Sequence, residues 1–518
     1  MRPLNLALLQ VSRRAERSTG SQLLASFVDV GDLSATVQGH DHQVMYGRRG
    51  TGKTHVLSIL ANRALERGDL PVQIDLRTLG STGGIYSDYS LPLAERGTRL
   101  LTDLLWAFHD AILEAALNDE TVDLKAVQVR LDALAAAVSD VRVVGQASQS
   151  VSENGSTTAS ASAGLGVGGT VPLSAQIGFS DSVTSSRATV ATVTGEIRHR
   201  IHFGAVSRCL TDLFSAIPNR RVWLLLDEWS EIPLDLQPYL SDLLRRSVFP
   251  VGAITVKVAA IEQRTNFRRV LEDGSDIGIE IGADGAPSLT LDDFMVFDND
   301  AHVATAFFRR LLWKHVVTSE TQGVALDMSE DEFASEAFTQ VSVLQELARA
   351  AEGVPRDALN IAAVAARMAG DRKISVADVR AAARQWYQQS KEAAVSSRQR
   401  ASELLHWIIS RVIGERRARA FLLPTGTRNE LIDYLYDSRV LHVIKKSVSS
   451  NDTPGIRYNV YAIDYGCYVD LISTANAPLG LLETESDTGE VVFADVPVTD
   501  YRSIRRAILD IDAFVAGS

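Results

Sequence analysis

A glycine-rich stretch near the N-terminus, YGRRGTGKTH at residues 46–55, has the residue types and spacing of a loop that binds phosphate groups. It fits the pattern G-x-x-x-x-G-K-[ST] through Gly47, Gly52, Lys53 and Thr54. Glycines let backbone N–H groups surround the phosphates, the lysine places a charge on the outer phosphates, and the hydroxyl binds Mg²⁺. The predicted nucleotide-binding loop comprises Gly47, Arg48, Arg49, Gly50, Thr51, Gly52, Lys53, Thr54 and His55.

An acidic pair, Asp227 and Glu228, ends a continuous apolar run at residues 222–226. Such a run is typical of a central parallel strand that is buried on both faces. Asp227 would hold Mg²⁺ at the end of this strand, and Glu228 would orient and deprotonate an attacking water; the alternative for Glu228 is a surface carboxylate. The pair therefore predicts an ATPase with ATP and Mg²⁺ as cofactors and with Thr54 and Asp227 as metal ligands.

Strands and helices must position these groups. Residues 43–46 predict a short apolar strand before the loop, and apolar residues at helical spacing follow the loop as far as Gly68. The N-terminus of that helix would direct its partial positive charge at the phosphates. Residues 71–77 and 250–261 predict further strands. The expected fold class is α/β, with the parallel sheet of a P-loop NTPase core.

Polar residues follow the strand predicted at residues 250–261. In this position many NTPases place a residue that senses the γ-phosphate, and the candidates are Gln263, Arg264 and Thr265. Arg268 and Arg269 lie just beyond them. They would either reach the nucleotide of a neighbouring subunit or form a solvated basic helix end.

A mostly helical pattern covers residues 329–389. Gly353 and Pro355 mark a break between two helices, which places Arg356 in the first turn of the second one. Ser375 begins a further helix. A small helical unit after a nucleotide-binding sheet is the layout of a lid domain.

The phosphate-binding loop, the acidic pair and the Gly-Val-Pro-Arg segment at residues 353–356 together resemble the AAA+ ATPases, closest to the initiator and origin-recognition type. They also resemble the related bacterial STAND-type signalling ATPases. The resemblance covers about residues 20–390. It implies that Arg356 contacts the γ-phosphate from the lid and reports hydrolysis, so that the expected catalytic residues are Glu228, Lys53 and Arg356.

The C-terminal part predicts helices at residues 403–412 and 428–436, followed by strands at 441–446 and 456–463. Two helices before a two-stranded ribbon resemble a winged helix, which initiator ATPases commonly carry. Basic residues that could contact the phosphates of duplex DNA are Arg416, Arg417, Arg419, Lys445, Lys446 and Arg457.

The charge of this part leaves two functions open. Residues 400–457 carry ten Arg and Lys against six Asp and Glu, whereas residues 464–512 carry ten acids and three bases. The first segment favours a protein that acts on DNA. Winged helices also dock proteins, so the alternative is a nucleotide-controlled switch that recruits a protein partner, as in bacterial signalling or anti-phage defence.

A Gly/Ser/Thr-rich segment lies between the loop and the acidic pair: 24 of the 48 residues from 145 to 192 are of these types. Alternation at residues 171–183 predicts a β-hairpin arm, either a tolerated surface excursion or a contact arm for a partner or neighbouring subunit. The expected domains are an N-terminal helical segment at 1–30, an ATPase core at 31–325 with an insertion at 118–196, a helical lid at 326–395 and a winged-helix-like domain at 396–518.

Composition sets wider bounds. The chain has 518 residues and a net charge of −12, which argues against a surface coated throughout with nucleic-acid-binding charge. Its two cysteines, Cys209 and Cys467, predict no disulfide framework and favour the cytoplasm. No uncharged apolar run reaches about 18 residues, so no membrane partner is expected.

Overall fold

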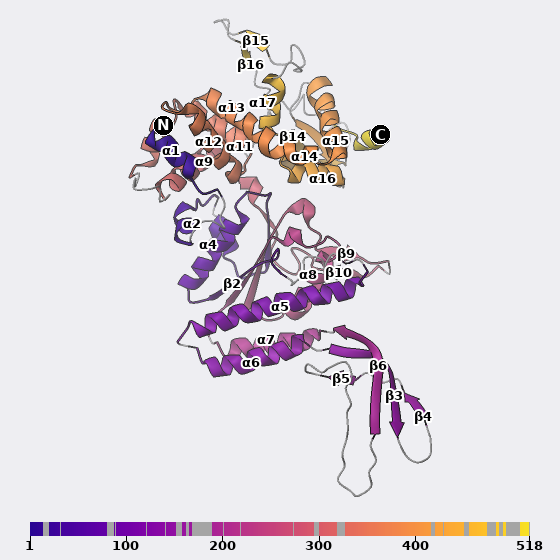
Figure 1. The fold of residues 1–518 in the computed structure, drawn as a ribbon. Helices are drawn as coiled ribbons and strands as arrows, with labels where there is room; N and C mark the ends of the chain where they lie inside the picture. Colours follow the sequence, from indigo (N-terminus) through magenta and orange to yellow (C-terminus); the bar gives the residue numbers. More distant parts are fainter. Residues whose placement is uncertain are drawn as a thin grey trace.

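A computed structural model gives the arrangement of the chain in space (Figure 1). It describes residues 1–13, 20–31, 33–79, 88, 90–120, 122–139, 141–151, 158–161, 165–167, 189–199, 201–217, 219–272, 274–294, 300–318, 327–415, 420–427, 429–449, 455–473, 483–485, 491–493 and 508–516. None of the helices in these ranges combines the length and apolar character needed to cross a bilayer.

A five-stranded sheet with the order β11-β1-β8-β7-β2 lies at the centre of the molecule, and every neighbouring pair in it is parallel. Its strands are β1 (Gln43–Tyr46), β2 (Leu70–Asp75), β7 (Val222–Asp227), β8 (Ile254–Ala260) and β11 (Leu289–Thr290). The predicted α/β fold with the parallel sheet of a P-loop NTPase is confirmed. The parallel direction brings the carboxyl ends of all five strands to one edge, where ligands bind in open α/β sheets.

Helices cover both faces of this sheet. Trp223 and Leu225 on β7 pack toward α4, whereas Leu224 and Leu226 pack toward α5, α7 and α8. The bounds of these helices are α4 (Lys53–Glu66), α5 (Leu93–Leu117), α7 (Phe203–Ser215) and α8 (Gln237–Ser247). A further helix, α6 (Leu124–Val138), packs against α5 and α7. The two-sided burial explains why the strand sequence is apolar without alternation.

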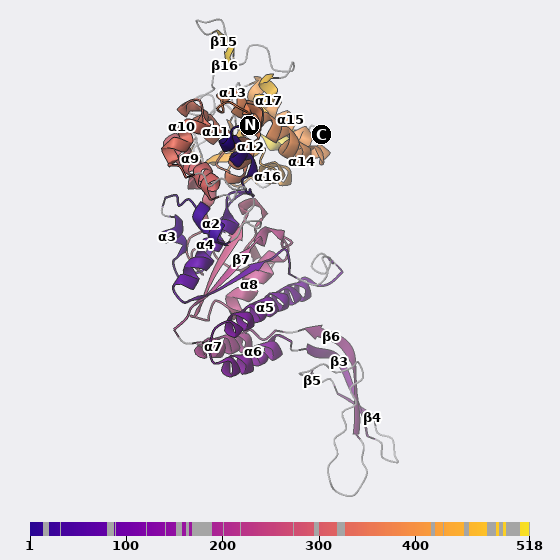
Figure 2. The same cartoon turned by 60° about the vertical axis from the view of Figure 1, so that its left-hand side comes forward.

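An arm built on two long strands leaves the body beyond α6 and α7 (Figures 1 and 2). Strands β3 (Val141–Val151) and β6 (Thr189–His199) pair antiparallel along their whole length. Two short strands, β4 (Thr158–Ala161) and β5 (Leu165–Val167), also pair with β3. The hairpin predicted from residues 171–183 lies outside the described residues.

A helical layer lies over the carboxyl edge of the sheet. It contains α1 (Pro3–Gln10), α9 (Ala301–Val317), α10 (Glu330–Ala337), α11 (Val341–Ala351), α12 (Pro355–Ala369) and α13 (Val376–Trp386). Ser329 and Ser375 begin α10 and α13 through reciprocal side-chain caps with Glu332 and Asp378. The chain breaks between α11 and α12 at Gly353, whose φ is +76°. Helix α1 packs against α12, and α2 (Gly20–Ser26) and α3 (Leu33–Val37) pack against α4.

The C-terminal domain packs beside this helical layer (Figure 2). It contains α15 (Gln399–Ile409), α16 (Glu430–Asp437), α17 (Tyr465–Ser473) and strands β12 (Ala420–Pro424), β13 (Leu441–Ser449) and β14 (Arg457–Ile463). The sheet order is β12-β14-β13. The two strands of the predicted ribbon are β13 and β14, which pair antiparallel, and β12 is a third strand that the sequence analysis missed. Strand β12 is a five-residue apolar segment without alternation between two helices, so it lacks a local strand pattern.

The remaining short elements are the hairpin β9 (Arg268–Val270) and β10 (Asp276–Gly278), the hairpin β15 (Glu483–Glu485) and β16 (Val491–Phe493), α14 (Ala393–Ser396) and α19 (Ile511–Ala516). A π-helical segment, Tyr387–Glu392, links α13 to α14 and so joins the helical layer to the C-terminal domain.

Candidate nucleotide-binding site

The phosphate-binding loop connects β1 to α4 and depends on two glycines with left-handed backbones. The φ angles of Gly50 and Gly52 are +91° and +95°. A Cβ on Gly50 would lie 2.8 Å from the Cβ of Arg356, and the Gly50 carbonyl accepts a hydrogen bond from the Arg356 backbone N–H at 3.2 Å. Gly50 therefore provides both the turn and the room for the first turn of α12 to touch the loop.

Lys53 is buried at the first position of α4. Its Nζ donates to the carbonyl oxygens of Gly47 and Arg48 at 2.8 and 3.1 Å. Burial lowers the pKa of Lys53, and the nearby carboxylates of Glu228 and Asp227 oppose that shift. An ammonium group held by carbonyl oxygens at the edge of a cavity is suited to bind an anion there.

Thr54 and Asp227 meet although 173 positions separate them. The Thr54 hydroxyl donates to Asp227 Oδ2 at 2.7 Å, and Asp227 Oδ1 accepts the backbone N–H of Glu228 at 2.8 Å. Thr54 lines the cavity, and the nearly fully buried Asp227 lies behind it. A hydroxyl beside a carboxylate is a set of oxygen donors that Mg²⁺ accepts in phosphate sites, so these residues fit the expected metal.

Glu228 follows β7 in a left-handed conformation with φ of +55° and lines the same cavity. Burial raises the pKa of Glu228, and the charge of Lys53 partly opposes this rise. Arg77 Nη1 lies 3.7 Å from Glu228 Oε1. Sequence reasoning missed Arg77, which follows β2. Asp75 on β2 pairs in register with Asp227 on β7. This register brings Arg77, two residues after Asp75, close to Glu228.

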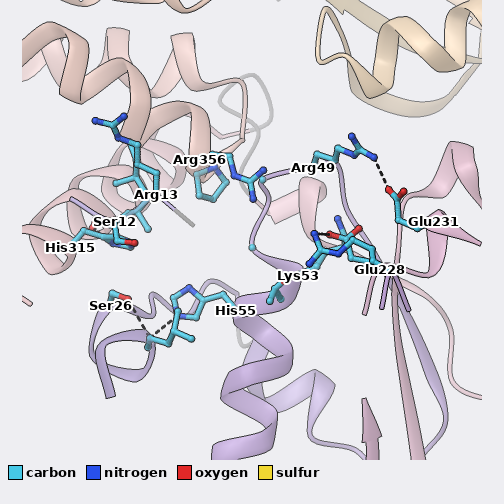
Figure 3. A pocket seen from close by; sticks show the side chains of 18 residues that line it. Ser12, Arg13, Ser26, Arg49, Lys53, His55, Glu228, Glu231, His315 and Arg356 are labelled. Atoms are coloured by element: carbon cyan, nitrogen blue, oxygen red, sulfur yellow. Dashed lines mark hydrogen bonds and ion pairs between the residues drawn. The ribbon is translucent and has the colours of Figure 1, made fainter. Parts of the chain in front are cut away.

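A cavity of about 430 Å³ joins these groups to the lid (Figure 3). Lys53 and Glu228 lie at one side of it, and Arg356 lies above them on the first turn of α12. The other side is lined by residues that the sequence did not single out: Ser12, Arg13, Leu23, Ser26, Leu311 and His315. The volume lies in the range of sites for small ligands.

Two histidines on that side are partly buried. Burial lowers the pKa of His315 to about 4, so its ring is neutral near pH 7. His315 shares a hydrogen bond of 3.0 Å with the carbonyl of Leu311, and His55 contacts the carbonyl of Leu23 at 2.6 Å. His55 thus links the predicted loop to α2. His315 lies on α9, 260 positions downstream, and nothing local in the sequence could have indicated it.

The side chains of the two consecutive loop arginines, Arg48 and Arg49, point to different sides of the loop. Arg49 lines the cavity and pairs with Glu231 at 2.7 Å. Arg48 is 1% exposed and pairs with Asp292 at 2.7 Å, away from the cavity. Thr51 is also buried, and its hydroxyl donates to the Arg48 carbonyl at 2.9 Å.

The candidates after β8 lie outside the cavity lining. Arg264 pairs with Asp437 of the C-terminal domain at 3.3 Å, and the Thr265 hydroxyl donates to the carbonyl of Ile261 at 2.6 Å. Gln263 is likewise absent from the lining residues. Arg268 and Arg269 form β9, so the predicted alternative of a helix end was wrong.

The predicted DNA contacts are only partly described. Arg416, Arg417 and Arg419 lie outside the described residues. Lys446 is paired with Glu262, which follows β8, at 2.6 Å, and the Arg457 guanidinium donates to the Ser447 carbonyl at 3.1 Å. Lys446 thus forms a partly exposed ion pair between the C-terminal domain and the core.

Comparison with known proteins adds one match at the loop. The model of a family described as ORC-CDC6-like matches residues 11–123, which include residues 47–55 of the loop. The chain resembles the ORC-CDC6-like proteins in this segment. The match confirms the resemblance to initiator-type AAA+ ATPases there and leaves the relation to STAND-type ATPases a prediction.

Among solved structures, the chain is similar to the ORC1 protein of Aeropyrum pernix in complex with DNA. The identity is 16%, the alignment covers 90% of this chain and 96% of that chain, and the TM-score is 0.31. No curated protein matches the chain.

Proposed function

We propose that this protein binds ATP with Mg²⁺, hydrolyses it in the manner of AAA+ ATPases, and acts on DNA under the control of its nucleotide state. One observation carries the proposal. Lys53, Thr54, Glu228 and Arg356 line a single cavity, and Asp227 is hydrogen-bonded to Thr54 directly behind it. These groups come from the loop, the end of β7 and the first turn of α12, and together they suit a triphosphate, a metal and a water.

The loop would bind the phosphates. Backbone N–H groups at the N-terminus of α4 and the Lys53 ammonium would hold the β- and γ-phosphates. Thr54 and Asp227 would hold Mg²⁺, which when bound neutralises charge on the phosphate oxygens. The carbonyl oxygens of Gly47 and Arg48 hold the Lys53 ammonium at the edge of the cavity.

Glu228 would act as the general base. Its carboxylate lines the cavity next to the Lys53 side of the loop, and burial raises its pKa toward neutrality, which favours proton uptake from an attacking water. Arg77, whose guanidinium is hydrogen-bonded to Asp75, adds a positive charge 3.7 Å from this carboxylate. The proton passes from the water to Glu228 as the water oxygen attacks the γ-phosphorus and the bond to the β-phosphate oxygen breaks.

Arg356 would connect the chemistry to the lid. Its backbone N–H is bonded to Gly50 in the loop, and its side chain lines the cavity from α12. A guanidinium that contacts the γ-phosphate loses this contact when the phosphate leaves, so hydrolysis would shift the lid relative to the core. The lid in turn carries the C-terminal domain.

The action on DNA would involve the C-terminal domain. Helices α15 and α16 and the β13–β14 ribbon support the predicted winged-helix-like layout, in which β12 adds a third strand. The exposed Lys445 and Arg457 lie on this ribbon, and Lys446 would become available if its pair with Glu262 opened. Binding through phosphates weakens steeply with salt, which provides a direct test.

The projecting arm favours a second function, the recruitment of a protein partner. Strands β3 and β6 carry the arm away from the body of the molecule (Figure 1). The described strands of the arm contribute neither to the cavity lining nor to the five-stranded sheet. A protein-recruiting switch would show no salt-dependent binding of duplex DNA and would hold its partner through the arm or the C-terminal domain.

ATP turnover with and without duplex DNA, together with sizing in ATP and in ADP, separates these functions. The proposal predicts Mg²⁺-dependent turnover that DNA changes, and DNA binding that falls with salt and with the paired substitution Lys445→Ala and Lys446→Ala. Turnover without any response to DNA would support the recruiting switch. Absence of ATP binding would overturn both.

A further inference from the structure

Arg48 fastens the phosphate-binding loop to two other parts of the molecule. Its backbone N–H and Nε donate to the two carboxylate oxygens of Asp292 at 3.0 and 2.7 Å. Its Nη2 donates to the carbonyl of Glu352, at the start of the lid break, at 2.8 Å. Its Nη1 donates to Nδ1 of His442, and its guanidinium carbon lies 5.6 Å from the ring centre of Tyr436. Core, lid and C-terminal domain therefore meet at one buried side chain.

His442 on β13 transmits this contact as a neutral ring. A guanidinium can only donate, so Nδ1 of His442 accepts, and Nε2 carries the proton that is donated to Asp464 Oδ2 at 3.1 Å. Burial, reinforced by the charge of Arg48, lowers the pKa of His442 to about 3. The ring therefore stays in one tautomer and holds Arg48 and Asp464 in a fixed geometry.

The chain of contacts continues to the lid arginine. Asp464 pairs with Lys391 at 2.5 Å, and Lys391 pairs with Asp357 at 3.0 Å. Arg439 of the C-terminal domain also pairs with Asp357. Asp357 follows Arg356 in the first turn of α12. One buried network thus holds the loop at one end and the neighbour of Arg356 at the other.

Ion pairs of this network cross the boundary between the C-terminal domain and the rest of the molecule. Three cations and three anions take part: Arg48, Lys391 and Arg439, with Asp292, Asp357 and Asp464. Arg439, His442 and Asp464 belong to the C-terminal domain. If that domain moved away, Arg48 would lose its contact with His442, and the buried charges would lose partners, which is strongly unfavourable.

We propose that Arg48 and His442 are positioning residues for the nucleotide site, through which docking of the C-terminal domain holds the phosphate-binding loop in its binding shape. A nucleotide in the cavity in turn favours the docked domain. The inference rests on the proposed function, because it takes the cavity as the ATP site. By linkage, the factor by which docking strengthens nucleotide binding equals the factor by which nucleotide strengthens docking.

The variant His442→Ala tests the first half of this coupling. The dissociation constants of ATP and ADP are measured with a fluorescent nucleotide, and we expect them to rise by about 5- to 150-fold. In steady state KM rises while kcat changes little. The variant His442→Gln, which keeps one acceptor and one donor, restores most of the affinity. The control Arg411→Ala, which removes an exposed pair with Glu415 within the C-terminal domain, leaves affinity unchanged.

Hydrogen exchange tests the second half by comparing the wild-type protein with His442→Ala. In the wild-type protein, ATP slows amide exchange in β13 and α16, and in His442→Ala it does not. Wild-type exchange that ATP leaves unchanged, or a folded His442→Ala that binds ATP as tightly as wild type, would overturn the inference while the proposed ATPase function stands. A wild-type protein that binds no ATP would instead overturn the proposed function.

Discussion

The two sides of the phosphate-binding loop are built on opposite principles. On the cavity side, Lys53 and Arg49 have hydrogen bonds to carbonyls or a partly exposed ion pair, and their charge faces an open space. On the rear side, Arg48 is enclosed among acceptors supplied by three parts of the protein. Charged groups on the cavity side face the space where a ligand would bind. On the rear side, the hydrogen-bond donors of Arg48 are bonded to protein acceptors. Substitutions on the cavity side should therefore change turnover, and substitutions on the rear side should change stability and, through docking of the C-terminal domain, the affinity for nucleotide.

The largest effect is expected at Glu228. Glu228→Gln keeps the shape of the cavity and removes the base, so turnover should fall by about 10²- to 10⁴-fold while ATP still binds. Steady-state turnover and equilibrium binding of ATP provide the two measurements. Turnover equal to that of the wild type would refute the role of Glu228.

The pH profile of turnover sharpens the same assignment. A general base works only in its deprotonated form, so turnover should decline as the pH falls through the pKa of Glu228. Because burial raises that pKa, the decline should begin at a higher pH than for an ordinary glutamate. The profile of Glu228→Gln should lack this limb. A shared limb in both proteins would assign it to another group.

The two loop arginines provide the clearest contrast in stability. Arg48→Ala leaves Asp292 without its buried cation and should lower the free energy of unfolding by about 3–5 kcal/mol. Arg49→Ala removes a partly exposed pair with Glu231 and should cost at most about 1 kcal/mol. Urea unfolding of both variants measures the difference. Equal losses of unfolding free energy in the two variants would contradict the claim that the buried contacts of Arg48 stabilise the fold more than the exposed pair of Arg49.

Acid should lower the free energy of unfolding through Asp464, an ion-paired carboxylate on the rear side of the loop. Burial acts to raise the pKa of Asp464, but the nearby Lys391 ammonium and His442 outweigh it and hold that pKa below its ordinary value. A depressed carboxyl pKa adds stability above about pH 3.9, the value in unfolded chains, and this stability is lost as the pH falls below it. Unfolding of Asp464→Asn should depend less on pH in that window. An unchanged pH dependence would contradict the ion pairing.

A smaller effect is expected at Arg356. Arg356→Ala should lower turnover by about 10-fold or more and leave the free energy of unfolding within about 1 kcal/mol, because its side chain faces the cavity. The measurement is turnover beside thermal unfolding. A large loss of stability with normal turnover would place Arg356 with the rear-side residues.

The part of the site that follows local patterns could be predicted from the sequence. Strands β1, β7 and β8 and the start of α4 follow from apolar runs and a glycine-rich loop, and the meeting of Thr54 with Asp227 follows from parallel strands with a common carboxyl edge. The cap at Ser375 follows from its position before a helix and from Asp378. These features depend on neighbours in sequence or on rules of sheet topology.

The rest depends on contacts between distant segments. Arg48 has the same local context as Arg49, and only Asp292 and His442, which lie 244 and 394 positions away, decide that it points to the rear. Strand β11 has two residues, too few for a pattern. Arg77 reaches Glu228 because β2 and β7 are neighbours in register, which the order of strands determines.

The binding of ATP by wild type and by Lys53→Ala, measured by titration calorimetry with Mg²⁺, tests the central claim most directly. The wild type should bind ATP at one site per chain, and Lys53→Ala should lose about 10²-fold or more of that affinity while retaining its fold by circular dichroism. If a folded Lys53→Ala bound ATP as tightly as the wild type, the cavity beside Lys53 would not be the nucleotide site.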